Sequence, residues 1–594
     1  MSAIWGIVDL LPGQTDGERK NRGGRLREEA VRMKKAYGTS RLDNICEKLG
    51  DDYYLACGVQ YVTREAEKER FPYGEDDGDC GRLFVGDVIL DNREPMKQRY
   101  PGRQEKREPS DGEILYECFH RDPEGTLEMA LGAYACAYLE REGHRITLFC
   151  DAVGNRSVYY CYRREEGIFY FSTLLAGITG ERERWECNED WFDRFFKIKD
   201  LRAVSEPRET PYRGILRLEP GEILTVTEAG LQRRSYWNPF ADRRILTGKS
   251  DPEYREMVTE VWKHCVEDVI RGDKETGILL SGGLDSNAVA ACAAPHLADR
   301  GRMLYSFTSV PEAEERKRRS GEYAVEDERS FVELVHDFQG NLLPEYIVTG
   351  KGDLLEENRR LRELLEVPYK AVLNLPWMYE SYERAAKRGC GILLSGQYGN
   401  ITISYGDFRC LFLTLLHRGR FRTLTQEICA YSKKYKRSRR WIWKDLLTAG
   451  TGQDFTAVSR YMYDKNALRQ IGEYEVKLSL ATGVVPRDPT RDRRLIELVL
   501  SLPVEQFTHA GQERRLVRQY MKGKIPEEIL SDEFHKGRQA VGSAELLERQ
   551  WEEICGRLPG IRKEASRNEK LSREEMVRRF YCGLAREYRR RFEL

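Results

Sequence analysis

The residues best suited to carry chemistry lie in the segment Ile278–Ser286, which reads ILLSGGLDS. Its apolar start predicts a buried strand, and the glycines that follow let backbone N–H groups approach an anion closely. The next helix directs its N-terminus at the same point, so a phosphate fits there. Asp285 is a natural carboxylate ligand for Mg²⁺ that bridges phosphates, and Ser281 and Ser286 add hydroxyl donors. The segment lacks the GKS/T ending of a Walker loop, and a generic Gly-Gly turn would not need six specified residues after an apolar strand.

The elements expected to position this loop change in kind along the chain. Up to about residue 237, short alternating runs predict strands of layered sheets, with a helix near Asp111–Phe119 and surface loops at 65–81 and 97–107. Beyond Pro239 a capping box at Ser250–Glu253 begins a helix. Strands and helices then alternate, as in a parallel sheet, and from about residue 405 the chain is mostly helical. The expected strands are 53–60, 83–90, 133–139, 146–150, 157–162, 168–172, 277–280, 304–310, 346–349 and 391–394.

SGGLDS resembles the pyrophosphate loop of the ATP-pyrophosphatase families, which split ATP between the α and β phosphates. Further segments narrow the resemblance to the asparagine-synthetase superfamily, over nearly the whole chain; they are MSAIWGI at the N-terminus, Pro220–Glu222, Tyr236–Pro239, Leu393–Asn400, Asp488–Leu495 and Ser501–Pro503. The resemblance implies an α/β and α+β protein. An Ntn-hydrolase-like αββα sandwich would span 1–238, and an α/β ATP-pyrophosphatase domain (adenine nucleotide alpha hydrolase-like) with a helical C-terminal part would span 239–594. It also implies ATP, Mg²⁺ and an AMP-forming carbon–nitrogen ligase activity.

Two departures from the family's glutaminase pattern predict that the N-terminal domain has no glutaminase activity. Glutamine-dependent members begin Met-Cys-Gly, whereas this chain has Ser2 and Ala3, and a serine hydroxyl is a much weaker nucleophile than a thiol near neutral pH. The family's Asn-Gly oxyanion pair falls on Val85-Gly86, and valine offers no side-chain donor. Asp111 still matches the family's substrate-binding aspartate. The alternative to a purely structural domain is an N-terminal serine hydrolase.

Without ammonia made in place, the nucleophile is expected to be another amine. Family members with an inactive N-terminal domain include β-lactam synthetases and lasso-peptide cyclases (macrolactam synthetases), and the segments at 396–400 and 487–495 are more similar to the cyclases. This resemblance implies that an Asp or Glu side chain of a precursor peptide is adenylated and that the peptide's N-terminal amine closes a macrolactam. A leader peptidase and a leader-binding protein would be further partners. The alternatives are an ammonia-dependent asparagine synthetase, a β-lactam synthetase-like ligase and a non-catalytic scaffold that binds peptide or nucleotide.

The resemblance also assigns roles to single residues. The nucleotide-binding set comprises Leu280, Ser281, Gly282, Gly283, Leu284, Asp285 and Ser286 around the pyrophosphate, and Ser306, Phe307, Thr308, Ser395 and Gly396 near the adenosine. Asp285 would ligate Mg²⁺, and Asn400 stands where the family usually has a second aspartate for the metal. Asp327-Glu328 is either the source of the missing negative charge or a solvated turn.

Three residues are candidates for the chemical step. Lys536 roughly matches the lysine that neutralises the family's acyl-adenylate transition state, and an ordinary surface lysine is the alternative. The family's glutamate before Pro-x-x-Asp is replaced by Val485, which cannot take a proton. Deprotonation of the amine therefore rests on Tyr398, on Glu328 or on solvent.

Composition limits the other classes of function. The 594 residues include 98 basic and 98 acidic ones, and this balance argues against a dedicated nucleic-acid binder. Fifteen cysteines without a CxxC pair and eight histidines without a metal motif predict reduced thiols and little room for a transition-metal site. With no signal peptide and no long apolar segment, we expect a cytoplasmic protein without a membrane partner. The basic run Lys433–Trp441 is a solvated surface, a nucleic-acid contact or a docking surface, and Asp488 with Asp492 forms an ion-pair face or contacts substrate.

Overall fold

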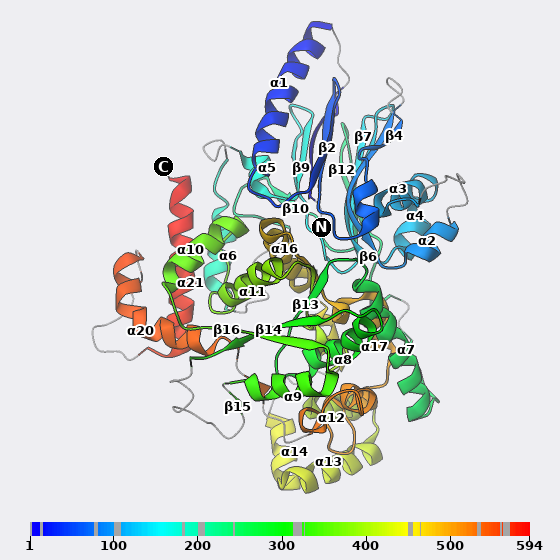
Figure 1. The fold of residues 1–594 in the computed structure, drawn as a ribbon, viewed down its shortest axis with the longest axis vertical. Helices are drawn as coiled ribbons and strands as arrows, with labels where there is room; N and C mark the ends of the chain where they lie inside the picture. Colours follow the sequence, from blue (N-terminus) through cyan, green and yellow to red (C-terminus); the bar gives the residue numbers. More distant parts are fainter. Residues whose placement is uncertain are drawn as a thin grey trace.

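Two antiparallel sheets make up the N-terminal half of the chain (Figure 1). The computed structural model describes residues 3–11, 16–75, 81–99, 108–180, 185–199, 208–241, 244–312, 324–325, 327–448, 455–463, 465–531, 536–537, 539–558, 561 and 571–593. The first sheet has the order β10-β8-β9-β1-β3-β2, and the second has the order β12-β11-β7-β6-β5-β4. Their strands are β1 (Ala3–Asp9), β2 (Asn44–Leu49), β3 (Tyr53–Val59), β4 (Tyr73–Glu75), β5 (Arg82–Leu90), β6 (Gly132–Glu140), β7 (Arg145–Cys150), β8 (Tyr159–Arg163), β9 (Ile168–Ser172), β10 (Leu216–Arg217), β11 (Glu222–Thr227) and β12 (Gly230–Ser235).

Strand alternation explains why these sheets have helices on their outer faces. In β1, Ile4 and Val8 enter the core between the two sheets, whereas Trp5 and Ile7 face outward and pack with α1 residues. Both faces are apolar, so each sheet needs a cover on its outer side. The helices are α1 (Asp16–Lys35) and α5 (Leu175–Thr179) against the first sheet, α2 (Arg93–Arg99), α3 (Asp111–Arg121) and α4 (Pro123–Met129) beside the second, and α6 (Glu189–Lys197). The predicted αββα sandwich is confirmed.

A five-stranded sheet with parallel pairing organises the second half. Its order is β16-β14-β13-β17-β18, and β13 lies in its centre between β14 and β17. Loops that follow neighbouring parallel strands meet at one edge of the sheet, which is where such folds bind ligands. The strands are β13 (Glu275–Leu279), β14 (Leu304–Val310), β16 (Leu342–Val348), β17 (Cys390–Leu394) and β18 (Val485–Arg487), and a separate short pair joins β15 (Ala324–Val325) to β19 (Lys536–Gly537).

Helices surround this sheet and fill the C-terminal part (Figure 1). The capping box predicted at Ser250 begins α7, with Glu253 Oε2 accepting the backbone N–H of Ser250 at 2.7 Å. The helices are α7 (Asp251–Val269), α8 (Leu284–Ala298), α9 (Arg329–Gln339), α10 (Leu354–Leu365), α11 (Leu375–Lys387), α12 (Phe408–His417), α13 (Phe421–Tyr435), α14 (Arg439–Thr448), α15 (Phe455–Met462), α16 (Lys465–Thr482), α17 (Arg493–Ser501), α18 (Arg515–Tyr520), α19 (Glu527–Leu530), α20 (Val541–Arg557) and α21 (Arg573–Arg589).

Three local predictions need correction. The expected loop at 65–81 contains a short 3-10 helix (Arg64–Lys68) and β4, and the expected loop at 97–107 begins inside α2. Asp488 and Asp492 do not share a helix face. Each carboxylate instead caps a different helical turn, accepting from the backbone N–H of Thr490 at 3.0 Å and of Arg494 at 2.8 Å. The proline between them starts the first of these turns and prevents one continuous helix.

Within the described part of the chain, no helix is long and apolar enough to cross a membrane. The cysteines described there are free, and most are buried. The described residues also contain no group of three His, Cys, Asp or Glu side chains arranged to hold a metal ion.

Candidate active site

The loop between β13 and α8 has the geometry of an anion site. The side chain of Ser286 accepts the backbone N–H of Ser281 at 3.1 Å, and the Ser281 hydroxyl accepts that of Gly283 at 3.1 Å. Asn287 Nδ2 donates to the carbonyls of Ser281 and Gly283 at 2.9 and 2.7 Å. These bonds fix the loop and point the carbonyls of Ser281 and Gly283 toward Asn287. Helix α8 begins directly after the loop. The helix N-terminus therefore faces the loop, as phosphate binding requires.

The second loop of the site, which follows β17, packs directly on the start of α8. A Cβ atom added to Gly396 would lie 2.9 Å from the Asp285 carbonyl carbon, and one added to Gly399 would meet the Asp285 carboxylate. Only glycine allows this close approach. The Ser395 hydroxyl is buried and, among the described residues, has no hydrogen-bond partner. A polar atom left without a partner beside a glycine cradle fits a nucleotide that would supply the missing hydrogen bond.

A cavity of about 390 Å³ joins these loops to α11 and α16. Seven residues that were predicted to bind the nucleotide or the metal line its loop end, and helices form its other end. The lining includes Leu280, Ser281, Asp285, Ser286, Ser395, Gly396 and Asn400 at the first end, and Ala371, Asn374, Trp377, Met378, Ile471, Tyr474, Glu475 and Leu478 at the second. The residues therefore fit ATP with Mg²⁺ held by Asp285, whose carboxylate also accepts the Ser404 hydroxyl.

Other predicted nucleotide ligands lie deeper. Ser306, Phe307 and Thr308 are fully buried in β14, and none of them lines the cavity. The backbone N–H of Leu280 donates to the Phe307 carbonyl at 3.1 Å, so this strand supports the loop from behind. Gly282, Gly283 and Leu284 likewise shape the loop without lining the cavity. Direct contact of Ser306–Thr308 with adenosine stays a prediction.

The Glu328 carboxylate accepts a hydrogen bond from one of the backbone N–H groups with which the loop could bind an anion. Its Oε1 accepts the backbone N–H of Gly282 at 3.1 Å, and burial raises the pKa of this carboxyl to about 7. Asp327 is engaged elsewhere, in an ion pair with Arg329 at 2.8 Å. A phosphate and the Glu328 carboxylate would compete for Gly282, because both are anions. Glu328 is therefore placed at the pyrophosphate end of the site.

Two further predicted residues are placed only in part. The backbone of Lys536 pairs with that of Ala324, and Gly537 packs against the Glu328 carboxylate, so this segment runs beside the pyrophosphate loop. The side chain of Lys536 lies outside the described residues. The side-chain Oδ1 of Asn400 accepts a hydrogen bond from Arg514 Nη2 at 3.0 Å, which puts a cation where a second metal ion was expected. Its role as a metal ligand stays a prediction.

Tyr398 belongs to a buried network that sequence reasoning did not foresee. Its backbone N–H donates to Asp488 Oδ2 at 3.1 Å, and the Arg491 guanidinium lies 5.9 Å from its ring centroid. Arg491 in turn donates to Glu475 Oε2 at 2.6 Å. Val485, which occupies the family's glutamate position, is fully buried in β18. Helical spacing on α16 places Glu475 on one face with Ile471, Tyr474 and Leu478. This spacing was the sequence signal that could have shown an acidic residue on an otherwise apolar face.

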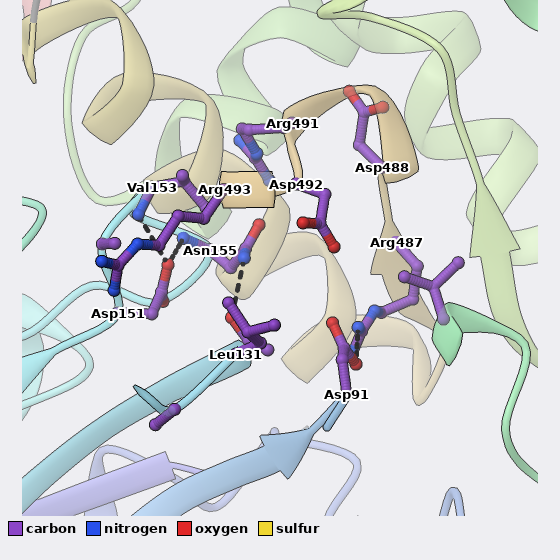
Figure 2. Close-up of a pocket in the computed structure, with 14 residues that line it drawn as sticks. Asp91, Leu131, Asp151, Val153, Asn155, Arg487, Asp488, Arg491, Asp492 and Arg493 are labelled. Carbon is purple, nitrogen blue, oxygen red and sulfur yellow. Dashed lines mark hydrogen bonds and ion pairs between the residues drawn. The ribbon is translucent and has the colours of Figure 1, made fainter. Parts of the chain in front are cut away.

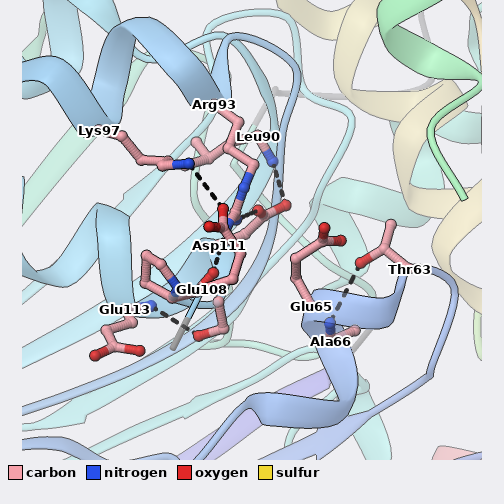
Figure 3. A network of polar contacts seen from close by, with 12 residues as sticks. Thr63, Glu65, Ala66, Leu90, Arg93, Lys97, Glu108, Asp111 and Glu113 are labelled. Carbon is pink, nitrogen blue, oxygen red and sulfur yellow. Dashed lines mark hydrogen bonds and ion pairs between the residues drawn. The ribbon is translucent and has the colours of Figure 1, made fainter. Parts of the chain in front are cut away.

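The predicted substrate aspartate of the N-terminal half already has partners from the chain itself. Asp111 Oδ1 accepts from Arg93 at 2.5 Å, and Oδ2 accepts from the backbone N–H of Leu90 at 3.0 Å (Figure 3). Oδ2 also accepts from Arg271 of the second half. The cavity beside these groups measures about 10 Å³, too small for an amino acid. Val85 is buried in the core between the sheets. Ser2 lies outside the described residues.

A second interdomain contact fixes the segment after β18. Figure 2 shows Asp91 and Asp151 of the N-terminal half around a cavity of about 30 Å³, facing Arg487, Asp488 and Arg491 of the second half. Asp91 and Arg487 form a buried ion pair. Burial raises the pKa of Asp151 and of Asp488 to about 6 in each case. The N-terminal half thus holds the segment that carries Asp488 and Arg491.

Comparison with known sequences decides the family. The model of the asparagine synthase family matches residues 257–593, and that of the glutamine amidotransferase domain matches residues 67–237. The chain belongs to the asparagine synthase family. It is 22% identical over 473 residues to "Asparagine synthetase [glutamine-hydrolyzing] 3" of Bacillus subtilis (strain 168), covering 76% of this chain and 74% of that protein. A second B. subtilis protein, "Asparagine synthetase [glutamine-hydrolyzing] 2", is 23% identical over 55% of this chain and 43% of its own length.

Among solved structures, the glutamine phosphoribosylpyrophosphate amidotransferase from B. subtilis complexed with ADP and GMP covers 58% of this chain and 90% of its own, with 12% identity and a TM-score of 0.26. Membership of the asparagine synthase family makes this chain an ATP-dependent, AMP-forming carbon–nitrogen ligase that uses Mg²⁺. ATP supplies the adenylyl group. The loops after β13 and β17 would hold its phosphates, and these residue roles stay predictions.

Proposed function

We propose that this ligase adenylates an Asp or Glu side chain of a precursor peptide and that the peptide's own N-terminal amine closes a macrolactam. The closed amidotransferase pocket supports this reading. Asp111 is held by Arg93 and Arg271, and too little space remains beside it for glutamine. Ammonia released from glutamine is then not the nitrogen source. A leader peptidase and a leader-binding protein would act on the same precursor.

The acceptor end of the cavity carries the strongest support for a peptide substrate. Free aspartate would bring an α-carboxylate that needs a cationic partner once it is buried. Among the described residues that line the cavity there is no Lys or Arg side chain. Ala371, Trp377, Met378 and Leu478 offer apolar surface instead. In a peptide, the α-carboxyl and α-amino groups of the reacting Asp or Glu are already in amide bonds, so that residue fits this lining better than a free amino acid does.

The surroundings of Trp377 add room for a chain. This side chain lines both the cavity and an open groove of about 520 Å³ that runs along α10 and α11. The groove is lined by side chains of both charges, among them Lys351, Glu357, Arg360 and Glu383. A peptide whose reacting end enters the cavity can extend along this groove. A single amino acid would leave it unused.

The test supplies the purified full chain with ATP-Mg²⁺ and a precursor peptide that carries a free N-terminus and an internal Asp or Glu. We expect AMP release and a peptide product lighter by one water, with its N-terminus blocked. In the matched control, Asp285→Ala, both signals should be lost while the folded state persists. AMP release with no loss of water from the peptide would contradict the proposal.

The names of the relatives favour a second candidate, an ammonia-dependent asparagine synthetase. Its test uses free aspartate with ammonium in place of the peptide. Asparagine and AMP formed in that reaction, with no turnover of the peptide, would support it. Tight ATP binding without AMP release, whether the peptide or aspartate is supplied, would point to a non-catalytic scaffold.

A further inference from the structure

We infer that Glu475 binds the attacking amine and holds it toward the acyl-adenylate. The inference rests on the family's amide-forming reaction and deepens the proposed function, because it says where the peptide's amine binds. Glu475 lines the same cavity as Ser281, Asp285 and Gly396. Of the described lining residues, only Asp285 and Glu475 are acidic, and Asp285 belongs to the phosphate end.

Helix α16 presents two acidic side chains in opposite directions. Glu473 turns toward the N-terminal half, where it pairs with Arg217 at 3.2 Å and accepts the hydroxyl of Tyr159. Glu475 turns toward the cavity together with Ile471, Tyr474 and Leu478. Both carboxylates are buried, and both pair with a buried arginine. Only Glu475 faces space that a substrate can enter, so Glu473 provides a matched comparison.

The Glu475 carboxylate is fixed by one oxygen and open at the other. Oε2 accepts from Arg491 Nη2 at 2.6 Å, and Arg491 is fully buried beneath the ring of Tyr398. Within the described part of the chain, the hydrogen bond of this carboxylate goes to Oε2 and none goes to Oε1, and Glu475 lines the cavity. A carboxylate oxygen is an acceptor only, so Oε1 suits an N–H donor such as an amine.

The anchor of Glu475 also relates it to the nucleotide loop. Arg491 follows Asp488 in the segment whose carboxylate binds the backbone N–H of Tyr398, two residues after Gly396. Three contacts therefore connect the acceptor end of the cavity to the phosphate end. They are Glu475 with Arg491, Arg491 with the Tyr398 ring, and Asp488 with the Tyr398 backbone N–H. An amine on Oε1 would be held at a set position relative to the adenylate, which is what an attacking nucleophile needs.

The step balances without any further reactant. The amine lone pair forms the C–N bond, and the bond between the acyl carbon and the phosphate oxygen breaks, so AMP leaves with that electron pair. The extra proton on nitrogen passes to Glu475 Oε1 and from there to water. Val485, buried and apolar, cannot take this proton, and Glu328 lies at the other end of the site.

The first test needs no substrate. The full chain is treated with a water-soluble carbodiimide and glycinamide, and mass spectrometry follows amide formation at each glutamate. We expect Glu475 to be labelled about tenfold faster than Glu473, because only the former is open to a small amine. Equal labelling of the two, or labelling of Glu473 alone, would overturn the inference.

The second test separates adenylation from amide formation, using the precursor peptide for both. In Glu475→Gln, ATP–pyrophosphate exchange should stay within about twofold of the parent, while amide formation falls about 100-fold. Glu475→Asp should recover part of that loss. Glu473→Gln, the matched variant, should leave the ratio of the two rates unchanged even if it lowers stability.

The outcomes distinguish the two proposals. Equal loss of exchange and amide formation in Glu475→Gln, or loss of neither, refutes the role of Glu475 and leaves the proposed function standing. If the parent chain shows no exchange with the peptide, the proposed function fails. The labelling ratio between Glu475 and Glu473 still decides the inference in that case.

Discussion

Replacing Asp111 with asparagine removes the negative charge that two arginines share, and we expect it to destabilise the contact between the two halves of the chain. The Asp111 side chain is 5% exposed, and that of Arg93 is 7% exposed. Breaking a buried ion pair on one side costs about 3–5 kcal/mol, because the remaining charge is left without compensation. Arg93 keeps Glu108 at 2.8 Å, and Arg271 keeps Glu65 at 3.4 Å. The expected loss is therefore near the lower end, about 3 kcal/mol.

The measurement is the urea midpoint at neutral pH, multiplied by the m-value of the transition. The control is Arg64→Ala. Arg64 and Asp273 also join the two halves, but their side chains are 79% and 59% exposed, so their ion pair is screened by water. The control should change the free energy of unfolding by no more than about 0.5 kcal/mol. Arg271→Met, which leaves Asp111 with Arg93, should fall between the two.

Equal effects of Asp111→Asn and Arg64→Ala would refute this reasoning, because burial would then not decide the strength of the contact. A second check is additivity. Asp111→Asn and Arg271→Met remove the same ion pair, so the double variant should lose less than the sum of the single losses. Full additivity would mean that the two residues do not interact.

Four further results are expected. The pKa of Glu328 is raised from 4.5 to about 7, so between these pH values the folded chain holds a proton that the unfolded chain has lost. The free energy of unfolding therefore falls as pH rises through 7. Glu328→Gln should remove this pH dependence and raise the free energy of unfolding at pH 8 by about 3 kcal/mol, measured by urea unfolding. Gly396→Ala should weaken ATP binding in a calorimetric titration, because the added Cβ would lie 2.9 Å from the Asp285 carbonyl carbon and push the two loops apart; unchanged affinity would contradict the close packing. Asp285→Ala should abolish AMP release without changing the circular dichroism spectrum, and retained release would remove its metal role. Ser2→Cys combined with Val85→Asn should still release no glutamate from glutamine, because Arg93 and Arg271 keep the pocket closed; glutamate release would show that the pocket opens.

The elements that sequence predicted well are those set by neighbouring residues. The capping box of α7, the strand before Ser281 and the parallel alternation up to β17 all depend on local signals, and each is present. The glycines of the two loops were predicted for the same reason, because a turn that leads into a helix is encoded in a short stretch of neighbouring residues. Asp488 and Asp492 were misplaced because their spacing suggested one helix, while Pro489 starts a short 3-10 turn that ends before α17 begins.

The contacts that sequence could not predict join residues far apart in the chain. Arg271 reaches Asp111 across 160 positions, and Arg487 reaches Asp91 across 396. Among 98 basic residues, no local pattern marks these two. Glu475 and Arg491 are only 16 positions apart, but they meet because α16 and the turn after β18 pack together. Such pairs follow from tertiary packing alone.

The two carboxylates that occupy ligand positions in this chain differ in one physical respect. Asp111 is neutralised by two guanidiniums and a backbone N–H, so opening its pocket would break buried ion pairs and leave charges without compensation. Glu328 holds a single described donor, Gly282 N–H, and its raised pKa shows that burial of its charge is poorly compensated. A phosphate with its Mg²⁺ would bring charge compensation that Glu328 lacks, so displacing Glu328 would cost less than displacing the arginines. The same electrostatic rule thus closes the amidotransferase site and leaves the ATP site able to open.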